Sequence, residues 1–193
     1  MKKSILTFAI LFCAVFTFGQ KNEFSLIKLD STWGQEVLRF PARDMDYIGV
    51  GEVRFPPKGW IQPEHTFFWS YTYAWSINLN KKIAAKELEI DLVKYFNSLN
   101  KVDVHDITDK RKATATIIKT RRKNSTTFFE GKVHTYDRFA TNQQFTLNVK
   151  IESHFCRKKQ KTVILFTFSP KEFTHSVWET LNDIALIDGF CEK

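Results

Sequence analysis

The sequence has few of the residues that interrupt or cross-link a protein chain. It contains seven glycines, five prolines and three cysteines among 193 residues. No Gly-, Ser- or Pro-rich linker, internal repeat or low-complexity tract divides it after the first residues, so we expect a single domain over residues 20–193. Three cysteines are also too few for a disulfide-rich scaffold.

Local motifs that specify a reaction are missing as well. The sequence contains no glycine-rich phosphate loop, no Gly-x-Ser-x-Gly elbow, no His-Glu-x-x-His motif and no Cys-x-x-Cys pair. These absences argue against the enzyme classes that carry such signatures. An active site built from distant residues leaves no local motif, so a hydrolase acting on envelope material stays an alternative. We name no catalytic residue, no metal ligand and no cofactor.

The beginning of the chain indicates export. Two lysines precede the apolar run 5–18, and small residues near its end fit cleavage before Gln20. We therefore expect a signal peptide over residues 1–19 and a periplasmic or secreted bacterial protein. The competing interpretation is a lipid anchor at Cys13, although the bulky Phe12 does not suit such a signal. No second apolar run follows, so we expect no transmembrane segment in the mature chain.

The mature chain is expected to be basic and to retain two cysteines. Removing the leader lowers the formal net charge from +8 to +6. This charge favours anionic partners such as anionic lipid, acidic polysaccharide or another envelope ligand. Nucleic acid is a weaker candidate, because no interleaved aromatic and basic motif is present. Cys156 and Cys191 are a candidate disulfide in an oxidising compartment, and the alternative is two separate thiols.

Residues 67–79 carry the strongest structural signal. Bulky side chains occupy every second position, with mostly small or polar residues between them. This alternation is typical of a strand with one aromatic face. Such a face is usually core, and the alternative is a ligand pocket, because Trp and Tyr rings combine apolar surface with polar edges. The candidate ligand-binding residues of this face are Trp69, Tyr71, Tyr73 and Trp75.

Helical and strand periodicities place this stretch in an α+β domain. Apolar side chains recur at three- and four-residue spacing over 83–99 and 174–187, which predicts two amphipathic helices. Further strands are predicted over residues 36–40, 47–55, 112–120, 126–139, 144–155 and 162–169. Residues 20–35 are expected to form an irregular lead-in. Hairpin connections then predict one antiparallel sheet of about six or seven strands, in the order β-β-β-α-β-β-β-β-α, with both helices on one face.

Two of the predicted strands can be aligned by their faces. The strand over 144–155 alternates apolar with polar side chains, which indicates one buried and one solvent-exposed face. Pairing Phe139 with Phe145 satisfies both faces and would place Glu130 opposite His154.

Basic residues concentrate in two of the predicted hairpin turns. Alternate turns of a meander lie at the same end of a sheet, so the turns near 119–123 and 157–161 should lie side by side. This basic rim could bind phosphate or carboxylate groups. The alternative is that its charges keep the hairpin ends solvated and prevent edge pairing. The rim residues are Lys119, Arg121, Arg122, Lys123, Arg157, Lys158, Lys159 and Lys161.

Two smaller groups of residues also have a chemical interpretation. His154 and Cys156 point the same way on one strand, as a base and a nucleophile could, but the sequence offers no third group to orient them. Asp103 and His105 could contribute metal ligands. We favour solvated loop residues over a metal site, because no second ligand cluster accompanies them.

Three stretches carry a resemblance to other proteins. GVGEVRFPPKGW at 49–60, FFWSYTYAWSI at 67–77 and SPKEFTHSVWETLNDI at 169–184 resemble a group of exported bacterial proteins with no assigned function. The resemblance implies one secreted domain and supplies no catalytic residues. We expect a non-enzymatic protein that binds an anionic or amphipathic envelope ligand through the basic rim, an aromatic pocket, or both. A structural module that engages a partner protein is a further alternative, and the sequence indicates no oligomeric state.

Overall fold

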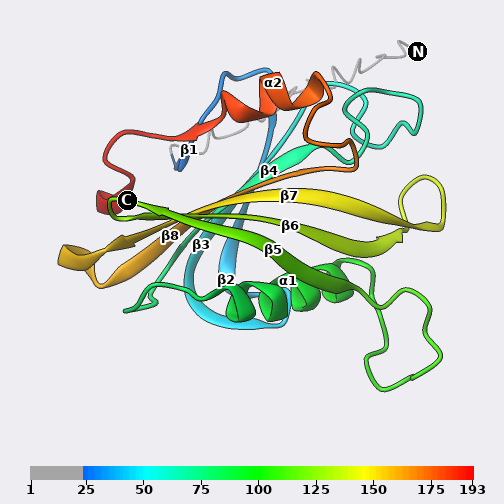
Figure 1. Ribbon diagram of the computed structural model, residues 1–193, viewed down its shortest axis with the longest axis horizontal. Coiled ribbons are helices and arrows are strands. Elements are labelled where there is room, and N and C mark those ends of the chain that lie inside the picture. Colours follow the sequence, from blue (N-terminus) through cyan, green and yellow to red (C-terminus); the bar gives the residue numbers. More distant parts are fainter. Residues whose placement is uncertain (1–23) are drawn as a thin grey trace, which may run out of the picture.

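A seven-stranded antiparallel sheet forms the centre of the protein in the computed structural model, which describes residues 24–193 (Figure 1). Its strands are β2 (Gly34–Ala42), β3 (Met45–Phe55), β4 (Tyr71–Ile77), β5 (Thr114–Lys123), β6 (Thr126–Asp137), β7 (Gln143–Cys156) and β8 (Lys161–Ser169). Their order across the sheet is β2-β3-β4-β8-β7-β6-β5. The α+β class with an antiparallel sheet is confirmed. The predicted signal peptide lies outside the described residues.

A second sheet joins the two ends of the described chain. β1 (Ile27–Lys28) pairs with β9 (Ala185–Leu186), so the expectation of a single sheet is wrong. The predicted helix over 174–187 is correspondingly shorter, because α2 spans only Val177–Asn182 and the residues after it turn into β9. Periodicity within one segment does not reveal pairing with a segment so distant in the sequence.

The two helices cover opposite faces of the large sheet (Figure 1). α1 (Ala85–Leu99) packs on the face that carries Tyr73 and Trp75, whereas α2 packs on the face that carries Ala74. Successive side chains of a strand point to opposite faces, so these neighbours in β4 meet different helices. The expectation that both helices lie on one face is wrong. The small side chains on the second face of β4 leave room for α2 and the lead-in to cover it.

The aromatic stretch is strand only in part. β4 begins at Tyr71, and the chain before it turns, with the Ser70 amide donating to the Phe67 carbonyl oxygen at 2.9 Å. The turn sends Phe67 to the α2 side of the sheet, while Trp69 stays on the α1 side. The predicted strand over 67–79 is therefore wrong at its first residues. The alternation there belongs to a turn that supplies aromatic side chains to both faces.

A buried carboxylate ties the lead-in to the sheet. Glu52 of β3 is fully buried and accepts hydrogen bonds from the amides of Leu26 and Ile27 and from Nε of Arg54. These donors compensate the carboxylate for its removal from water. The lead-in therefore forms part of the packed structure and is not irregular throughout.

α1 is joined to the sheet through the β2–β3 hairpin. The Glu87 side chain accepts a hydrogen bond from the Ala84 amide at 2.9 Å, which satisfies a backbone donor at the start of the helix. Tyr47 of β3 donates a 2.6 Å hydrogen bond to Asp91 of α1. The predicted helix over 83–99 agrees closely with α1. Within residues 24–193, no helix combines the length and apolar character that crossing a membrane requires.

The β6–β7 pairing differs from the expected register. Glu130 lies opposite Lys150, and His154 lies opposite Thr126. The expected pairing of Glu130 with His154 is wrong because β6 ends at Asp137, so the turn to β7 begins two residues earlier than expected. The displacement is an even number of residues, so each side chain keeps its predicted face.

Candidate ligand-binding cavity

A cavity of about 240 Å³ lies between α1 and the β2–β3–β4 side of the large sheet. Its walls come from these three strands, the end of α1 and three connecting segments. The lining residues are Glu36, Leu38, Arg43, Val53, Phe55, Trp60, Trp69, Tyr71, Tyr95, Leu99 and Phe139. Six of the eleven are aromatic, so the walls are mainly apolar and carry few polar atoms.

The four predicted aromatic residues are divided between this cavity and the core. Trp69 and Tyr71 line the cavity. Tyr73 and Trp75 are 0% and 1% exposed, and Trp75 packs on Phe166 with 4.5 Å between the ring centroids. The predicted aromatic face is therefore packed core under one part of α1 and the wall of a cavity under the other.

Two aromatic side chains from connecting segments close part of the cavity. Trp60 packs against Phe55 and Phe139, with ring centroids 4.8 and 5.8 Å apart. Phe139 is 42% exposed and borders the solvent. The chain before Trp60 depends on Gly59, whose φ is 83° and whose missing Cβ leaves room for the His65 ring. Sequence reasoning missed both closing residues, because connecting segments have no periodic pattern.

The Phe139 backbone is held by a buried carboxylate. Asp137 accepts hydrogen bonds from the amides of Phe139, Ala140 and Thr141 at 2.9, 3.1 and 2.8 Å. Burial alone would raise the pKa of Asp137, but hydrogen bonds from Thr141 and from the Phe139 amide outweigh burial and hold the pKa below its usual value. The ionised carboxylate thus fixes the turn that carries Phe139 over the cavity.

Two tyrosine hydroxyls supply polar edges to the aromatic walls. The Tyr71 hydroxyl donates to the Tyr95 hydroxyl, with 3.4 Å between the oxygens. Burial raises the pKa of Tyr95 to about 12 and raises that of Tyr71 as well. The positive charge of Arg43 opposes this rise at both hydroxyls, and the negative charge of Glu36 adds to it at Tyr95. Both hydroxyls stay protonated at neutral pH and can donate or accept hydrogen bonds.

Arg43 and Glu36 are the two charged residues in the cavity lining. Arg43 is half-buried in the turn between β2 and β3, and Glu36 is exposed on β2. Within residues 24–193, neither side chain forms an ion pair. Neither residue could be recognised as a site residue in the sequence, because Arg43 lies in a turn and Glu36 in a strand with no chemical motif.

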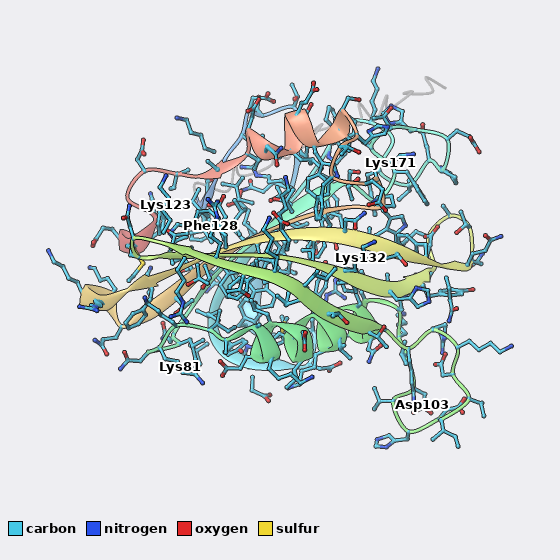
Figure 2. The ribbon with its side chains drawn as sticks, viewed as in Figure 1. Lys81, Asp103, Lys123, Phe128, Lys132 and Lys171 are labelled. Atoms are coloured by element: carbon cyan, nitrogen blue, oxygen red, sulfur yellow. A yellow bond between two sulfur atoms is a disulfide. The ribbon has the colours of Figure 1, made fainter. Side chains whose placement is uncertain are left out.

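The residues of the predicted basic rim gather at one end of the sheet but not on one surface. Asn124 of the β5–β6 turn and Arg157 of the β7–β8 turn line the same shallow hollow. Figure 2 shows Lys123 at this end, near the C-terminal residues. Strand alternation puts Arg121 on the α2 side of β5 and Arg122 on the other side.

Part of the rim is engaged by the end of the chain. Lys159 pairs with Glu192 at 2.9 Å, and the Lys161 ammonium donates to the carbonyl oxygen of Lys193. Lys161 is only 8% exposed, so it has little surface left for a ligand. The other rim residues are Lys119, Arg121, Arg122, Lys123, Arg157 and Lys158, of which Lys119 pairs with Glu130 at 3.3 Å.

The two cysteines of the described chain form a disulfide. The Cα atoms of Cys156 and Cys191 are 5.6 Å apart, and the bond holds the C-terminal residues against the β7–β8 turn. Cys156 therefore has no thiol to act as a nucleophile beside His154. The His154 ring instead makes a 3.0 Å hydrogen bond with Oγ1 of Thr126 and packs on Phe190.

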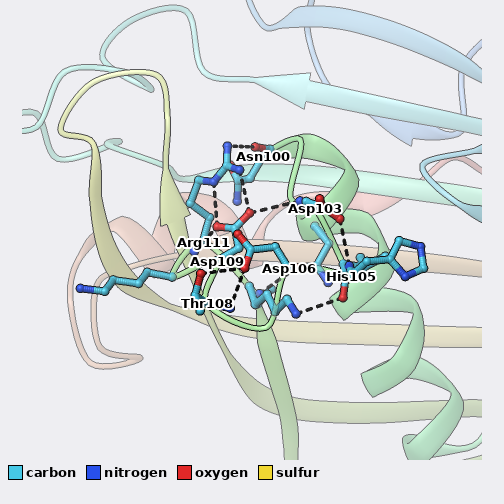
Figure 3. A network of polar contacts seen from close by, with 12 residues as sticks. Asn100, Asp103, His105, Asp106, Thr108, Asp109 and Arg111 are labelled. Carbon is cyan, nitrogen blue, oxygen red and sulfur yellow. Dashed lines mark hydrogen bonds and ion pairs between the residues drawn. The ribbon is translucent and has the colours of Figure 1, made fainter.

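The loop between α1 and β5 uses its carboxylates to shape its own backbone (Figure 3). Asp109 binds the Arg111 guanidinium at 2.7 Å and accepts a 3.1 Å hydrogen bond from the Asp103 amide. Asp103 in turn accepts a 2.9 Å hydrogen bond from the His105 amide. In the part of the chain that the structure describes, no group of three potential metal ligands is found. The interpretation of Asp103 and His105 as solvated loop residues fits this arrangement.

Comparison with protein-family models, with curated protein sequences and with solved structures found no match.

Proposed function

We propose that this protein is an exported, non-enzymatic binding protein whose aromatic cavity holds a small amphipathic ligand. The observation that carries the proposal is the cavity of about 240 Å³ beside α1. Ligand sites are typically concave and mainly apolar, with a few placed polar groups. The cavity has this composition, because its aromatic walls carry the hydroxyls of Tyr71 and Tyr95.

The size of the cavity limits the ligand. Its volume of about 240 Å³ is below the roughly 300–1,000 Å³ of sites for drug-sized molecules. A molecule with one ring or a short aliphatic chain fits this space better than an extended lipid chain.

The lining supports binding over hydrolysis. Among the described lining residues there is no His, Cys, Ser or Lys, and Glu36 is the single carboxylate. Hydrolysis by a protein nucleophile needs a nucleophile with a base to activate it. The cavity instead offers aromatic surface, two tyrosine hydroxyls and two charges, which suit recognition.

The cavity is also a better site than the basic rim. Lys159 and Lys161 are engaged by Glu192 and by the Lys193 carbonyl oxygen. The remaining rim cations lie on different faces of the sheet. Support for export comes from the signal-peptide pattern, and the disulfide agrees with an oxidising compartment.

Binding of a neutral probe tests the proposal. Isothermal titration with 3-phenylpropan-1-ol should show saturable binding, because the phenyl ring fits the aromatic walls and the hydroxyl meets the tyrosines. Leu38→Trp fills the cavity and should lower the affinity by at least about tenfold, the effect of losing roughly 1.4 kcal/mol.

A matched variant separates cavity filling from damage to the fold. Val37→Trp places the same side chain on the opposite face of β2 and should leave binding unchanged. Thermal unfolding of both variants reports whether they fold. No binding to the wild type, or equal binding by the wild type and a folded Leu38→Trp variant, would refute the proposed function.

A further inference from the structure

Two opposite charges border one aromatic cavity without neutralising each other. Arg43 and Glu36 both belong to its lining, yet they form no ion pair with each other or with any other described residue. A charge next to low-dielectric aromatic walls interacts more strongly with a bound ion than a charge surrounded by water. The pair is therefore available to a ligand that carries matching charges.

The position of Arg43 is unusual for an arginine. Arg43 and Asp44 have φ angles of 53° and 59°, and they form the tight turn between β2 and β3. Gly and Asn are preferred in such a turn, because a side chain with a Cβ is disfavoured at positive φ. The backbone therefore does not explain an arginine at this position. Its half-buried side chain contributes to the cavity lining instead.

The charge of Arg43 acts on the interior of the cavity. It opposes the rise in pKa of the buried hydroxyls of Tyr71 and Tyr95. Arg43, Tyr71 and Tyr95 line the same cavity, so the guanidinium and the two tyrosine side chains border one ligand space. An anionic group of a ligand in the cavity would meet Arg43 and a tyrosine hydroxyl together.

Glu36 supplies the opposite charge at the border of the cavity. Strand alternation puts Glu36 on the same face of β2 as Leu38, toward α1. Its exposed carboxylate borders the solvent. A ligand with only an anionic group would bring a second negative charge close to Glu36, which is unfavourable. A cationic group on the ligand would remove that repulsion and replace it with attraction.

We infer that the ligand is zwitterionic, with an apolar body between the aromatic walls, an anionic group at Arg43 and a cationic group at Glu36. This inference rests on the proposed function. An α-amino acid with an apolar side chain is the simplest molecule of this class. The charge pair thus selects among the small amphipathic molecules that the cavity could hold.

Four probes that share a phenyl ring test the inference by isothermal titration to the full mature protein. They are L-phenylalanine with both charges, 3-phenylpropionate with the negative charge, phenethylamine with the positive charge, and neutral 3-phenylpropan-1-ol. L-Phenylalanine should bind more tightly than each of the other three, by about tenfold or more, because only it can form charge-assisted hydrogen bonds with both Arg43 and Glu36.

Removing the charge of Arg43 or of Glu36 shows which charged group of the ligand each residue binds. Arg43→Gln should lower the affinity for L-phenylalanine and 3-phenylpropionate and leave that for phenethylamine unchanged or higher. Glu36→Gln should lower the affinity for L-phenylalanine and phenethylamine only. Arg39→Gln and Asp46→Asn remove exposed charges of the same hairpin that do not line the cavity, and both should bind all four probes as the wild type does.

The outcomes separate the inference from the proposed function. If 3-phenylpropan-1-ol or either singly charged probe binds as tightly as L-phenylalanine, the zwitterion inference is wrong while ligand binding stands. Equal losses for all four probes in Arg43→Gln would also overturn it, since this would show a change in cavity shape and not in charge recognition. If none of the four probes binds, the proposed function fails and the inference fails with it.

Discussion

The hydroxyl of Tyr47 donates a 2.6 Å hydrogen bond to Oδ2 of Asp91 and thereby fastens the β2–β3 hairpin to α1. The same hairpin carries Glu36 and Arg43, and α1 carries Tyr95. The contact therefore joins two walls of the cavity.

Tyr47→Phe should destabilise the protein, by about 1–3 kcal/mol at neutral pH. Burial raises the pKa of Asp91, and the Tyr47 hydrogen bond opposes that rise. A group with a raised folded pKa contributes stability below its unfolded pKa and loses that contribution as the pH rises through the folded pKa. Removing the hydroxyl raises the folded pKa further, so the loss of stability should be larger at neutral pH than near about pH 3.

Urea unfolding at the two pH values measures this difference. Tyr136→Phe removes a hydroxyl that makes no hydrogen bond among the described side chains, and it should change stability little at either pH. An equal effect of Tyr47→Phe at both pH values would show that the hydroxyl does not act through the Asp91 carboxylate.

Asp137→Ala should weaken both stability and ligand binding. The substitution leaves the amides of Phe139 and Thr141 without their acceptor, which costs about 1–3 kcal/mol, and it releases Phe139 from the cavity. The folded pKa of Asp137 is lowered, so its contribution is present above the unfolded pKa and is lost as the pH falls through the folded pKa. The stability of the variant should depend less on pH over the acid range.

Circular dichroism during acid titration compares the unfolding transition of Asp137→Ala with that of the wild type. Asp183→Ala removes an exposed carboxylate and should unfold over the same acid range as the wild type. An Asp137→Ala variant with the wild-type acid transition would contradict the role given to this carboxylate.

Gly59→Ala should be more damaging than Gly189→Ala. Both glycines have positive φ, 83° and 69°, so the backbone penalty for a Cβ is similar. A Cβ at Gly59 would lie 2.0 Å from the His65 ring, whereas a Cβ at Gly189 meets nothing within 4 Å. We expect an additional loss of about 1–3 kcal/mol at Gly59, measured by urea unfolding. Equal losses would mean that the His65 contact does not constrain the loop.

Cys191→Ser should lower stability and release the C-terminal residues from the basic rim. The disulfide spans 35 residues, and opening a loop of this size costs about 3–4 kcal/mol in the chain-entropy model. Lys159 and Lys161 should then lose their partners, so retention on an acidic polysaccharide column should rise and should fall again with added salt. Unchanged retention in a folded variant would show that the tail does not mask these lysines.

The α+β class and the strands from β5 to β8 could be predicted from strand-type runs separated by short polar turns, and the alternation of apolar with polar side chains in β7 also revealed its buried face. α1 could be predicted because its apolar positions recur with helical spacing. The pairing of Ile27 with Leu186 could not be predicted, since neither two-residue strand is long enough to show a period. The predicted register of β6 and β7 was wrong because the Asp137 carboxylate binds the amides that follow it and so ends β6 early. This interaction involves only a few residues and leaves no periodic pattern in the sequence.

Only some residues of the candidate site could be predicted from the sequence. Trp69 and Tyr71 belong to a conspicuous aromatic pattern, but the same pattern contains Tyr73 and Trp75, which are packed core. Nothing in the alternation separates the two pairs, because the difference depends on where α1 lies. Arg43 and Glu36 become site residues only when the β2–β3 hairpin is placed against α1.

The indole N–H signals of the five tryptophans offer the most direct test of the cavity as the ligand site. In an NMR titration with 3-phenylpropan-1-ol, the signals of Trp60 and Trp69 should shift, because these residues line the cavity. The signals of Trp33 and Trp178 should stay in place, because both belong to the cluster on the opposite face of the sheet. Shifts confined to Trp33 and Trp178, or no shift at any tryptophan, would contradict the account.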